Sequence, residues 1–199
     1  MMDEDKIVQR ARRGDAAAFE QLVTAYRDRV YRLALRLCGN EADADEAAQD
    51  AFLAAWRGLP NFRGESRFST WLYQLVNHAA IDLLRQEKRQ VAAGDIDEVD
   101  APDTAPSPHR LAERNEQRQA VREAVLALPE EQRQVVVLRF MEELSYEEIG
   151  AALHLPTGTV KSRLNRAKAA LREILSQKGN LFDGENVIHT EKSGKEVQP

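Results

Sequence analysis

The sequence predicts an all-α protein made of two small helical domains joined by an acidic, flexible linker, the second domain carrying a helix-turn-helix. Three observations support this fold class. Apolar residues recur at helical spacing on both sides of one proline-rich segment, and no run shows the sustained alternation of a β-strand outside a helical pattern. A length of 199 residues also suits two domains of modest size.

The linker is identified by its composition. Residues 91–108 read VAAGDIDEVDAPDTAPSP, with three prolines, five acids and no base. The net charge of −5 therefore lies in this segment, and the rest of the chain is balanced. We expect a first domain at 1–90, a linker at 91–110, a second domain at 111–178, and at 179–199 a disordered tail rather than a docking peptide.

The first domain is expected to be a bundle of about four helices. Apolar positions repeat from Phe19 to Leu37, from Phe52 to Leu59 and from Trp71 to Ile81. The pair Gly39-Asn40 is typical of a helix C-cap, and a second break is expected between Gly58 and Gly64.

In the second domain, helices are expected over residues 111–128, 130–140, 146–153 and 157–175, with Pro129 ending the first. Ser145 followed by Glu148 predicts a capping box at the start of the third. Residues 154–158 then form a turn into a helix with an inward apolar stripe of Val160, Leu164, Ala167 and Leu171.

The outward side of that last helix is basic. From Thr157 to Lys178 there are six basic residues and one acid. A short helix, a tight turn and a basic second helix are typical of a DNA-binding helix-turn-helix, whose second helix enters the major groove. The alternative, a surface helix with solvated charges, explains the charges but not the whole arrangement.

Other classes of function find little support. Cys38 is the only cysteine and the four histidines are scattered, so we expect no metal and no cofactor. An enzyme with an accessory DNA-binding domain is disfavoured because neither a catalytic nucleophile with its general base nor a phosphate-binding loop is apparent.

No apolar run approaches the roughly 18 residues of a membrane span, and the acidic N-terminus is unlike a signal peptide. We expect a cytoplasmic protein without membrane insertion.

Residues 128–171 (LPEEQRQVVVLRFMEELSYEEIGAALHLPTGTVKSRLNRAKAAL) resemble the C-terminal promoter-recognition domain of bacterial sigma factors, especially the extracytoplasmic-function (ECF) group. The resemblance implies that this helix-turn-helix reads the minus-35 promoter element. Lys161, Ser162, Asn165 and Arg166 match the family's contacting positions. The full set of expected minus-35 contacts is Thr157, Thr159, Lys161, Ser162, Asn165, Arg166 and Lys168.

Residues 43–56 (DADEAAQDAFLAAW) resemble the sigma segment that docks on a coiled coil of the polymerase β′ subunit. The resemblance assigns core binding to Asp45, Glu46, Gln49 and Asp50. On a helix, the acids at 43, 46 and 50 share one face, and Phe52, Trp56 and Leu59 share another that can be buried. Ala47 and Ala48 depart from the larger aliphatics common in the family. A solvated helix face is the alternative for the acids taken alone.

Residues 62–85 (FRGESRFSTWLYQLVNHAAIDLLR) resemble the sigma region that opens the minus-10 element and captures non-template bases. Aromatic rings interleaved with arginines suit stacking on freed bases and phosphate contact. Expected contacts are Arg63, Phe68, Ser69, Trp71, Asn77, His78 and Arg85. Core packing is an equal alternative for Phe68 and Trp71. The asparagine that the family often has at the position of His78 stands one residue earlier, as Asn77.

Together these segments imply a sigma factor, which is not an enzyme. Its expected partners are the polymerase core, through the β′ coiled coil and the β flap, promoter DNA and an anti-sigma factor. The alternative is a two-domain helix-turn-helix regulator that acts without polymerase. Such a regulator would need neither the acidic docking helix nor the aromatic segment.

Overall fold

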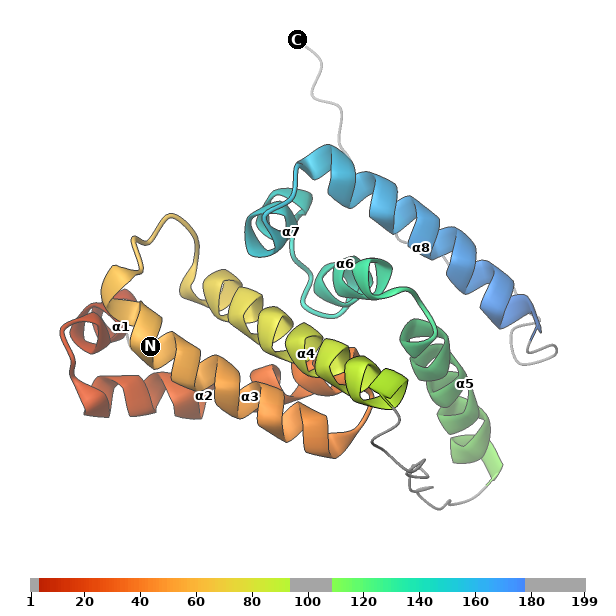
Figure 1. Ribbon diagram of the computed structural model, residues 1–199, viewed down its shortest axis with the longest axis horizontal. Coiled ribbons are helices and arrows are strands. Elements are labelled where there is room, and N and C mark those ends of the chain that lie inside the picture. The colour runs from red at the N-terminus through yellow and green to blue at the C-terminus, as the bar shows by residue number, and fades with distance from the viewer. Residues whose placement is uncertain (1–3, 94–108, 178–199) are drawn as a thin grey trace, which may run out of the picture.

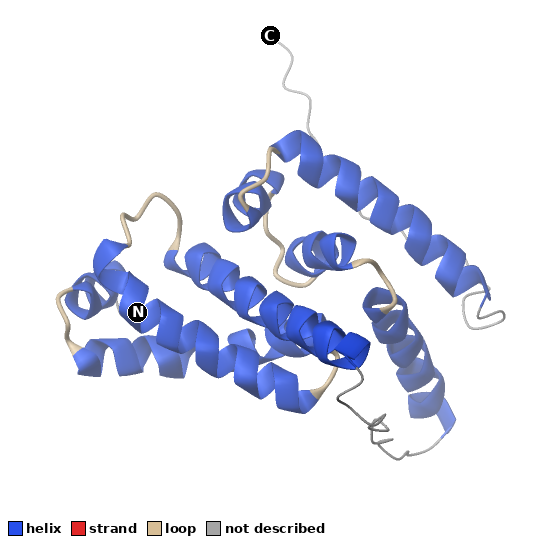
Figure 2. Cartoon of the chain, in the orientation of Figure 1, coloured by secondary structure: helices blue, strands red, loops and turns tan. Residues whose placement is uncertain are grey.

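The computed structural model describes residues 4–93 and 109–177, and all regular structure in these ranges is helical (Figures 1 and 2). The elements are α1 (Glu4–Arg12), α2 (Ala16–Cys38), α3 (Glu41–Gly58), the 3₁₀ turn η1 (Leu59–Asn61), α4 (Phe68–Ala93), α5 (His109–Leu126), α6 (Glu130–Phe140), α7 (Tyr146–Leu153) and α8 (Thr157–Gln177). The all-α prediction is confirmed. Residues 94–108 of the predicted linker and the predicted tail lie outside the described residues.

Helices α1–α4 form the first domain, and local sequence sets their ends. The Asp15 carboxylate accepts a hydrogen bond from the Ala18 amide at the start of α2. Gly39 ends α2 with φ 93°, a left-handed conformation that favours glycine, as predicted for the Gly39-Asn40 pair. Asn40 then caps α3 by accepting from the Asp43 amide at 2.8 Å. Only Gly39 and Asn40 therefore separate two capped helices, which makes α2 and α3 antiparallel neighbours (Figure 1).

The buried face of α3 is made of alanines. Ala44, Ala47, Ala51 and Ala55 are 0% exposed, and such small side chains allow α3 to lie close to its neighbours. The expectation that Phe52 and Trp56 share a buried face with Leu59 is only partly right. Leu59 is fully buried, but Trp56 is 37% exposed and Phe52 half-buried, because the alanine stripe takes the core position.

Helices α5–α8 form the second domain, and α7 and α8 are its helix-turn-helix. The predicted capping box is confirmed, since the Glu148 amide donates to Ser145 Oγ at 3.1 Å and the Ser145 amide to Glu148 Oε2 at 2.9 Å. His154 ends α7 in a left-handed conformation with φ 52°. A Cβ on Gly150 would lie 2.7 Å from the Leu155 carbonyl oxygen, so only glycine permits this tight turn.

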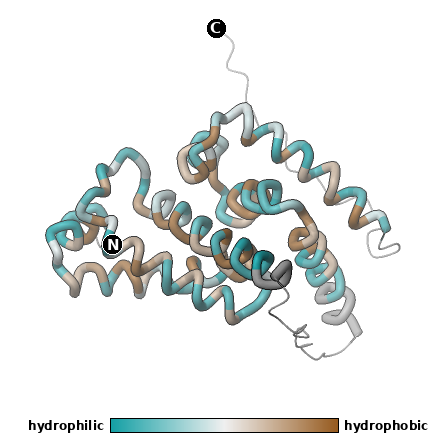
Figure 3. The backbone as a smooth tube through the Cα atoms, in the orientation of Figure 1, coloured by the Kyte–Doolittle hydropathy of each residue, from teal (hydrophilic) through white to brown (hydrophobic). Residues whose placement is uncertain are grey.

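The two domains pack against each other. Helix α4 lies beside α7, and the C-terminal half of α2 meets α5 and α6 (Figure 1). The buried apolar residues of both domains form one continuous cluster. Figure 3 shows that hydrophobic residues recur along the helices of both domains. Helix α4 continues to Ala93, three residues past the predicted domain end. In the described ranges, no helix combines the length and apolar character needed to cross a bilayer.

Cys38 offers a test of this packing. Its side chain is 8% exposed at the end of α2, and burial raises the pKa of its thiol to about 12. Since the thiolate is the reacting species, the native protein at pH 8 should react with Ellman's reagent far more slowly than the guanidinium-unfolded protein. Equal rates before and after unfolding would contradict the buried position of this thiol.

Candidate nucleic-acid interfaces

The outward face of α8 is the most clearly formed of the predicted surfaces. Val160, Leu164 and Ala167 are buried, as the apolar stripe predicts, and Leu171 is half-buried. On the opposite face, Thr157, Lys161, Asn165 and Arg166 are exposed, and Thr159, Ser162 and Lys168 are half-buried. All seven predicted minus-35 residues therefore lie on the first three turns of one helix.

Contacts within the domain orient several of these side chains. Ser162 Oγ donates to the Thr159 carbonyl at 2.9 Å, and Arg166 Nη2 lies 3.5 Å from Ser162 Oγ. The ammonium groups of Lys161 and Lys168 lie over the rings of Tyr146 and Phe140, at 5.7 and 5.8 Å from the centroids. These weak contacts hold the cations at the edge of the surface and leave their other faces open to a phosphate.

Arg163 shows what the sequence pattern could not resolve. It lies between predicted contact residues on α8, yet its side chain is only 18% exposed and its guanidinium pairs with Glu131 of α6 at 2.9 Å. Arg163 thus binds α8 to α6, whereas the exposed Arg166 faces solvent. The difference comes from α6, which is distant in sequence from α8.

The aromatic segment forms a packed cluster at the start of α4. Phe68 is 4% exposed, and its ring lies 5.4 Å from Tyr26, 6.2 Å from Phe62 and 5.9 Å from Trp71. Phe62 is also buried, and Trp71 is half-buried. Of the two readings of Phe68, the structure supports core packing. Trp71 keeps an accessible edge.

The remaining predicted minus-10 residues differ in accessibility. Asn77 is 2% exposed and therefore does not reach the surface in this structure, a correction to its expected role as a direct contact. Arg63 and His78 are exposed and Ser69 is half-buried. Arg85 is exposed but pairs with Glu130 of the second domain at 2.9 Å. These side chains follow the length of α4 rather than forming one closed site.

The predicted core-docking residues lie on the outer surface of α3. Asp45, Glu46, Gln49 and Asp50 are all exposed. Such a row of carboxylates creates a negative surface that can orient a basic partner. The structure places all four together, as the helical spacing predicts.

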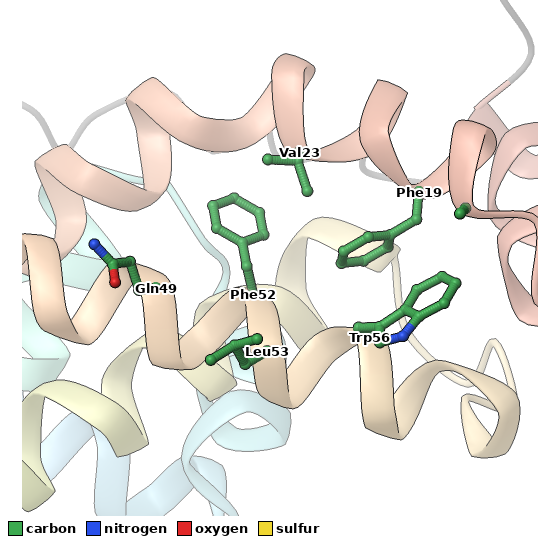
Figure 4. A pocket seen from close by; sticks show the side chains of 7 residues that line it. Phe19, Val23, Gln49, Phe52, Leu53 and Trp56 are labelled. Atoms are coloured by element: carbon green, nitrogen blue, oxygen red, sulfur yellow. The ribbon is translucent and has the colours of Figure 1, made fainter.

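An apolar groove adjoins this acidic surface and was missed by sequence reasoning. Figure 4 shows its lining of Phe19 and Val23 from α2 and Phe52, Leu53 and Trp56 from α3, with Gln49 at one end. The groove has a volume of about 540 Å³, and the Phe19 and Trp56 rings lie 5.0 Å apart. Leu53 is 52% exposed, an unusual environment for leucine. The only sequence signal for this groove was the helical spacing of Phe52 and Trp56, and that spacing predicted a buried face rather than an open groove.

Comparison with known families matches both halves of the chain. The sequence matches the family model of sigma-70 region 2 over residues 22–90 and that of sigma-70 region 4 over residues 118–171. It is 37% identical over 180 residues to the RNA polymerase sigma-H factor of Pseudomonas aeruginosa, covering 86% of this chain and 93% of that protein. It is 35% identical over 178 residues to the ECF RNA polymerase sigma-E factor of Escherichia coli K12, covering 85% and 93%.

Solved structures show the same likeness. CnrH, in complex with the cytosolic domain of CnrY, superposes with a TM-score of 0.64 at 25% identity, covering 89% of this chain and 100% of that one. The sigma factor RpoE of Bartonella quintana, in complex with the anti-sigma factor NepR, gives a TM-score of 0.63 at 25% identity, covering 79% and 96%.

The burial of Phe68 predicts a loss of stability on truncation. Phe68→Ala should lower the free energy of unfolding by about 3–5 kcal/mol, because it removes a ring packed among three others. The check is chemical denaturation followed by circular dichroism. Arg63→Ala is the matched control, since the Arg63 side chain is 83% exposed and should change stability by less than about 0.5 kcal/mol. Similar stability of both variants would contradict the core position of Phe68.

Proposed function

Because this chain belongs to the sigma-70 family, as an ECF sigma factor, we propose that its exposed surfaces divide the steps of initiation among them. A sigma factor is a non-enzymatic subunit that directs RNA polymerase to specific promoters. Matches to both region 2 and region 4 carry this conclusion. A regulator that acts without polymerase does not account for the region 2 match.

The outer surface of α3 is the proposed docking site for the polymerase core. The carboxylates of Asp45, Glu46 and Asp50 would orient a basic surface of the β′ coiled coil, and Gln49 adds hydrogen-bonding capacity. All four are exposed and supported by the rigid alanine face beneath them. Charged groups of this kind contribute to orientation and association rate.

The start of α4 and the loop before it are proposed to act on the minus-10 element. Trp71, Ser69, His78 and Arg63 can approach DNA directly, since Arg63 and His78 are exposed and Ser69 and Trp71 are only half-buried. Phe68 and Asn77 are proposed to support this surface from beneath, because both are buried. Arg85 would contact a phosphate once its ion pair with Glu130 is released.

Helix α8 is proposed to read the minus-35 element. Lys161, Asn165 and Arg166 lie on its exposed face and can reach base edges in the major groove. Thr157, Thr159, Ser162 and Lys168 are placed to contact the phosphate backbone beside them. The second domain would also contact the polymerase β flap, as the family resemblance implies.

Two further proposals follow from the relatives. Since CnrH is solved with the cytosolic domain of CnrY, and the Bartonella factor with the anti-sigma factor NepR, we propose that an anti-sigma factor also binds this protein. We place the protein in the cytoplasm, where its polymerase partner works.

Run-off transcription tests the proposed function. Core polymerase supplied with a promoter library should yield specific transcripts only when this protein is added. Charge reversal of Asp45, Glu46 and Asp50 to lysine should reduce transcript yield at least about tenfold, because core docking loses its electrostatic complementarity. Reversal of Glu20, exposed on the same domain but outside the docking surface, is the control. Full activity of the triple variant, with helical content intact, would remove α3 as the docking site.

Two residues of α8 should behave differently in the holoenzyme. If the Arg166 guanidinium contacts a base edge, Arg166→Ala should weaken the free energy of promoter binding by about 1–3 kcal/mol and relax base preference at one minus-35 position. Lys168→Ala should weaken binding to all sequences alike and reduce the salt slope by about one unit, because its charge contacts phosphate. Binding measured across a minus-35 library separates the two effects. A uniform loss for Arg166→Ala would reassign that residue to phosphate contact.

A further inference from the structure

A second pocket lies between α2 of the first domain and α5 of the second, two helices that contact each other. It has a volume of about 780 Å³, which falls in the range of roughly 300–1,000 Å³ usual for small-molecule sites. None of its lining residues belongs to the surfaces assigned above to DNA or to the polymerase core. The pocket therefore has no role in the function proposed above.

Four arginines line this pocket in two pairs. Arg32 and Arg36 lie one turn apart on α2, and Arg118 and Arg122 lie one turn apart on α5. Like charges at this spacing repel each other, so an anion bound between the pairs would stabilise both helices. The protein as a whole has a net charge of −5, so the surplus of positive charge at the pocket is local.

Only part of this positive charge is offset by the protein itself. Arg36 pairs at 3.2 Å with Glu142, whose side chain is 8% exposed. Burial raises the pKa of that carboxyl, against the positive charges of Arg36 and Arg32. Arg122 donates to the Gly39 carbonyl oxygen at 3.3 Å, which is a neutral acceptor. Among the residues that the structure describes, no acid lines the pocket, so the arginines remain able to bind an anion.

The floor of the pocket is apolar. Leu35 and Met141 are half-buried and Val125 is 4% exposed, whereas three of the four arginines are exposed. Val121 is 37% exposed, so an apolar side chain of α5 faces solvent among the arginines. The pocket therefore offers positive charge at its rim and an apolar surface beneath it.

This combination selects a chemical class of ligand. Guanidinium groups bind phosphate through paired hydrogen bonds, and arginines on two helices can hold one phosphate from two sides. An apolar floor adds affinity for a hydrocarbon or ring system attached to that phosphate. Inorganic phosphate would leave the floor in water, and an uncharged hydrocarbon would leave the arginines without an anion.

We propose that the pocket between α2 and α5 binds a small, soluble amphipathic phosphate, that is, a phosphorylated molecule with an apolar body. The phosphate contacts the arginines, and the apolar body lies on Val121 and Val125. A ligand at this position contacts both domains and stabilises the folded chain by mass action. Because the site shares no residue with the DNA or core surfaces, ligand binding and promoter recognition can fail independently.

Isothermal titration calorimetry of the full-length protein with monomeric octyl phosphate tests this site. Octyl phosphate should bind with a stoichiometry of one, at least about tenfold more tightly than inorganic phosphate, because burial of only two of its methylene groups is worth about that factor. It should also bind more tightly than octanol, which lacks the phosphate. Equal affinities for octyl phosphate and inorganic phosphate would overturn the proposal.

Two arginine variants locate the binding. Arg32→Ala and Arg118→Ala should each weaken octyl phosphate binding at least about fivefold, because each removes a charge-assisted hydrogen bond. Both side chains are exposed, so both variants should fold, which circular dichroism checks. The matched control is Arg27→Ala, which removes the same side chain from α2 at a position that is 71% exposed and outside the pocket. Equal affinities of the control and the two pocket variants would overturn the proposal.

Two other occupants of the pocket are distinguished by further titrations. One is the chain's own acidic segment, tested by replacing Asp95, Asp97, Glu98 and Asp100 with their amides. Octyl phosphate binding that is unchanged in this variant supports the proposal, and binding that appears only in this variant overturns it. The other is a membrane surface. Binding to phosphatidylglycerol vesicles without binding to octyl phosphate would also overturn the proposal.

Discussion

Burial of the Glu142 carboxylate between the two domains is the constraint on which the other interdomain contacts depend. Removing a carboxylate from water costs several kcal/mol, and the cost is offset only where charge and hydrogen-bond partners are well placed. Arg36 and Tyr73 supply both from separate helices of the first domain. The next residue, Glu143, adopts φ 57°, a strained conformation that turns the chain sharply after α6. Since α7 begins three residues later, the position of Glu142 sets where α7 lies on α4.

The same packing leaves surfaces of α3 and α8 exposed and covers the first part of α4. The acidic surface of α3 is exposed, the neighbouring groove of Phe52, Leu53 and Trp56 is open (Figure 4), and the basic face of α8 is exposed as well. The first part of α4 faces inward. There the His78 ring of α4 stacks on the His154 ring at the end of α7.

Local sequence was sufficient to predict most elements but not their mutual arrangement. The bounds of α6 and α7, the capping box of Ser145 and the Gly39-Asn40 break depend on residues within a few positions of each other, and all are confirmed. Phe68, Arg163 and Trp56 were harder to assign because their environments are set by residues far away in sequence. Tyr26 encloses Phe68, Glu131 holds Arg163, and a stripe of alanines displaces Trp56 from the core. The contact of Glu142 with Arg36 spans 106 residues and has no local signal.

The central claim is that the two domains pack against each other through the buried contact of Glu142 with Arg36. Electron–electron distance measurement between spin labels on Arg27→Cys in α2 and Glu173→Cys in α8, both exposed, addresses this directly, since the buried Cys38 should remain unlabelled. The account predicts one narrow distance distribution for the free protein, because the packed domains hold the two labels at one separation. A broad distribution in the free protein would contradict it.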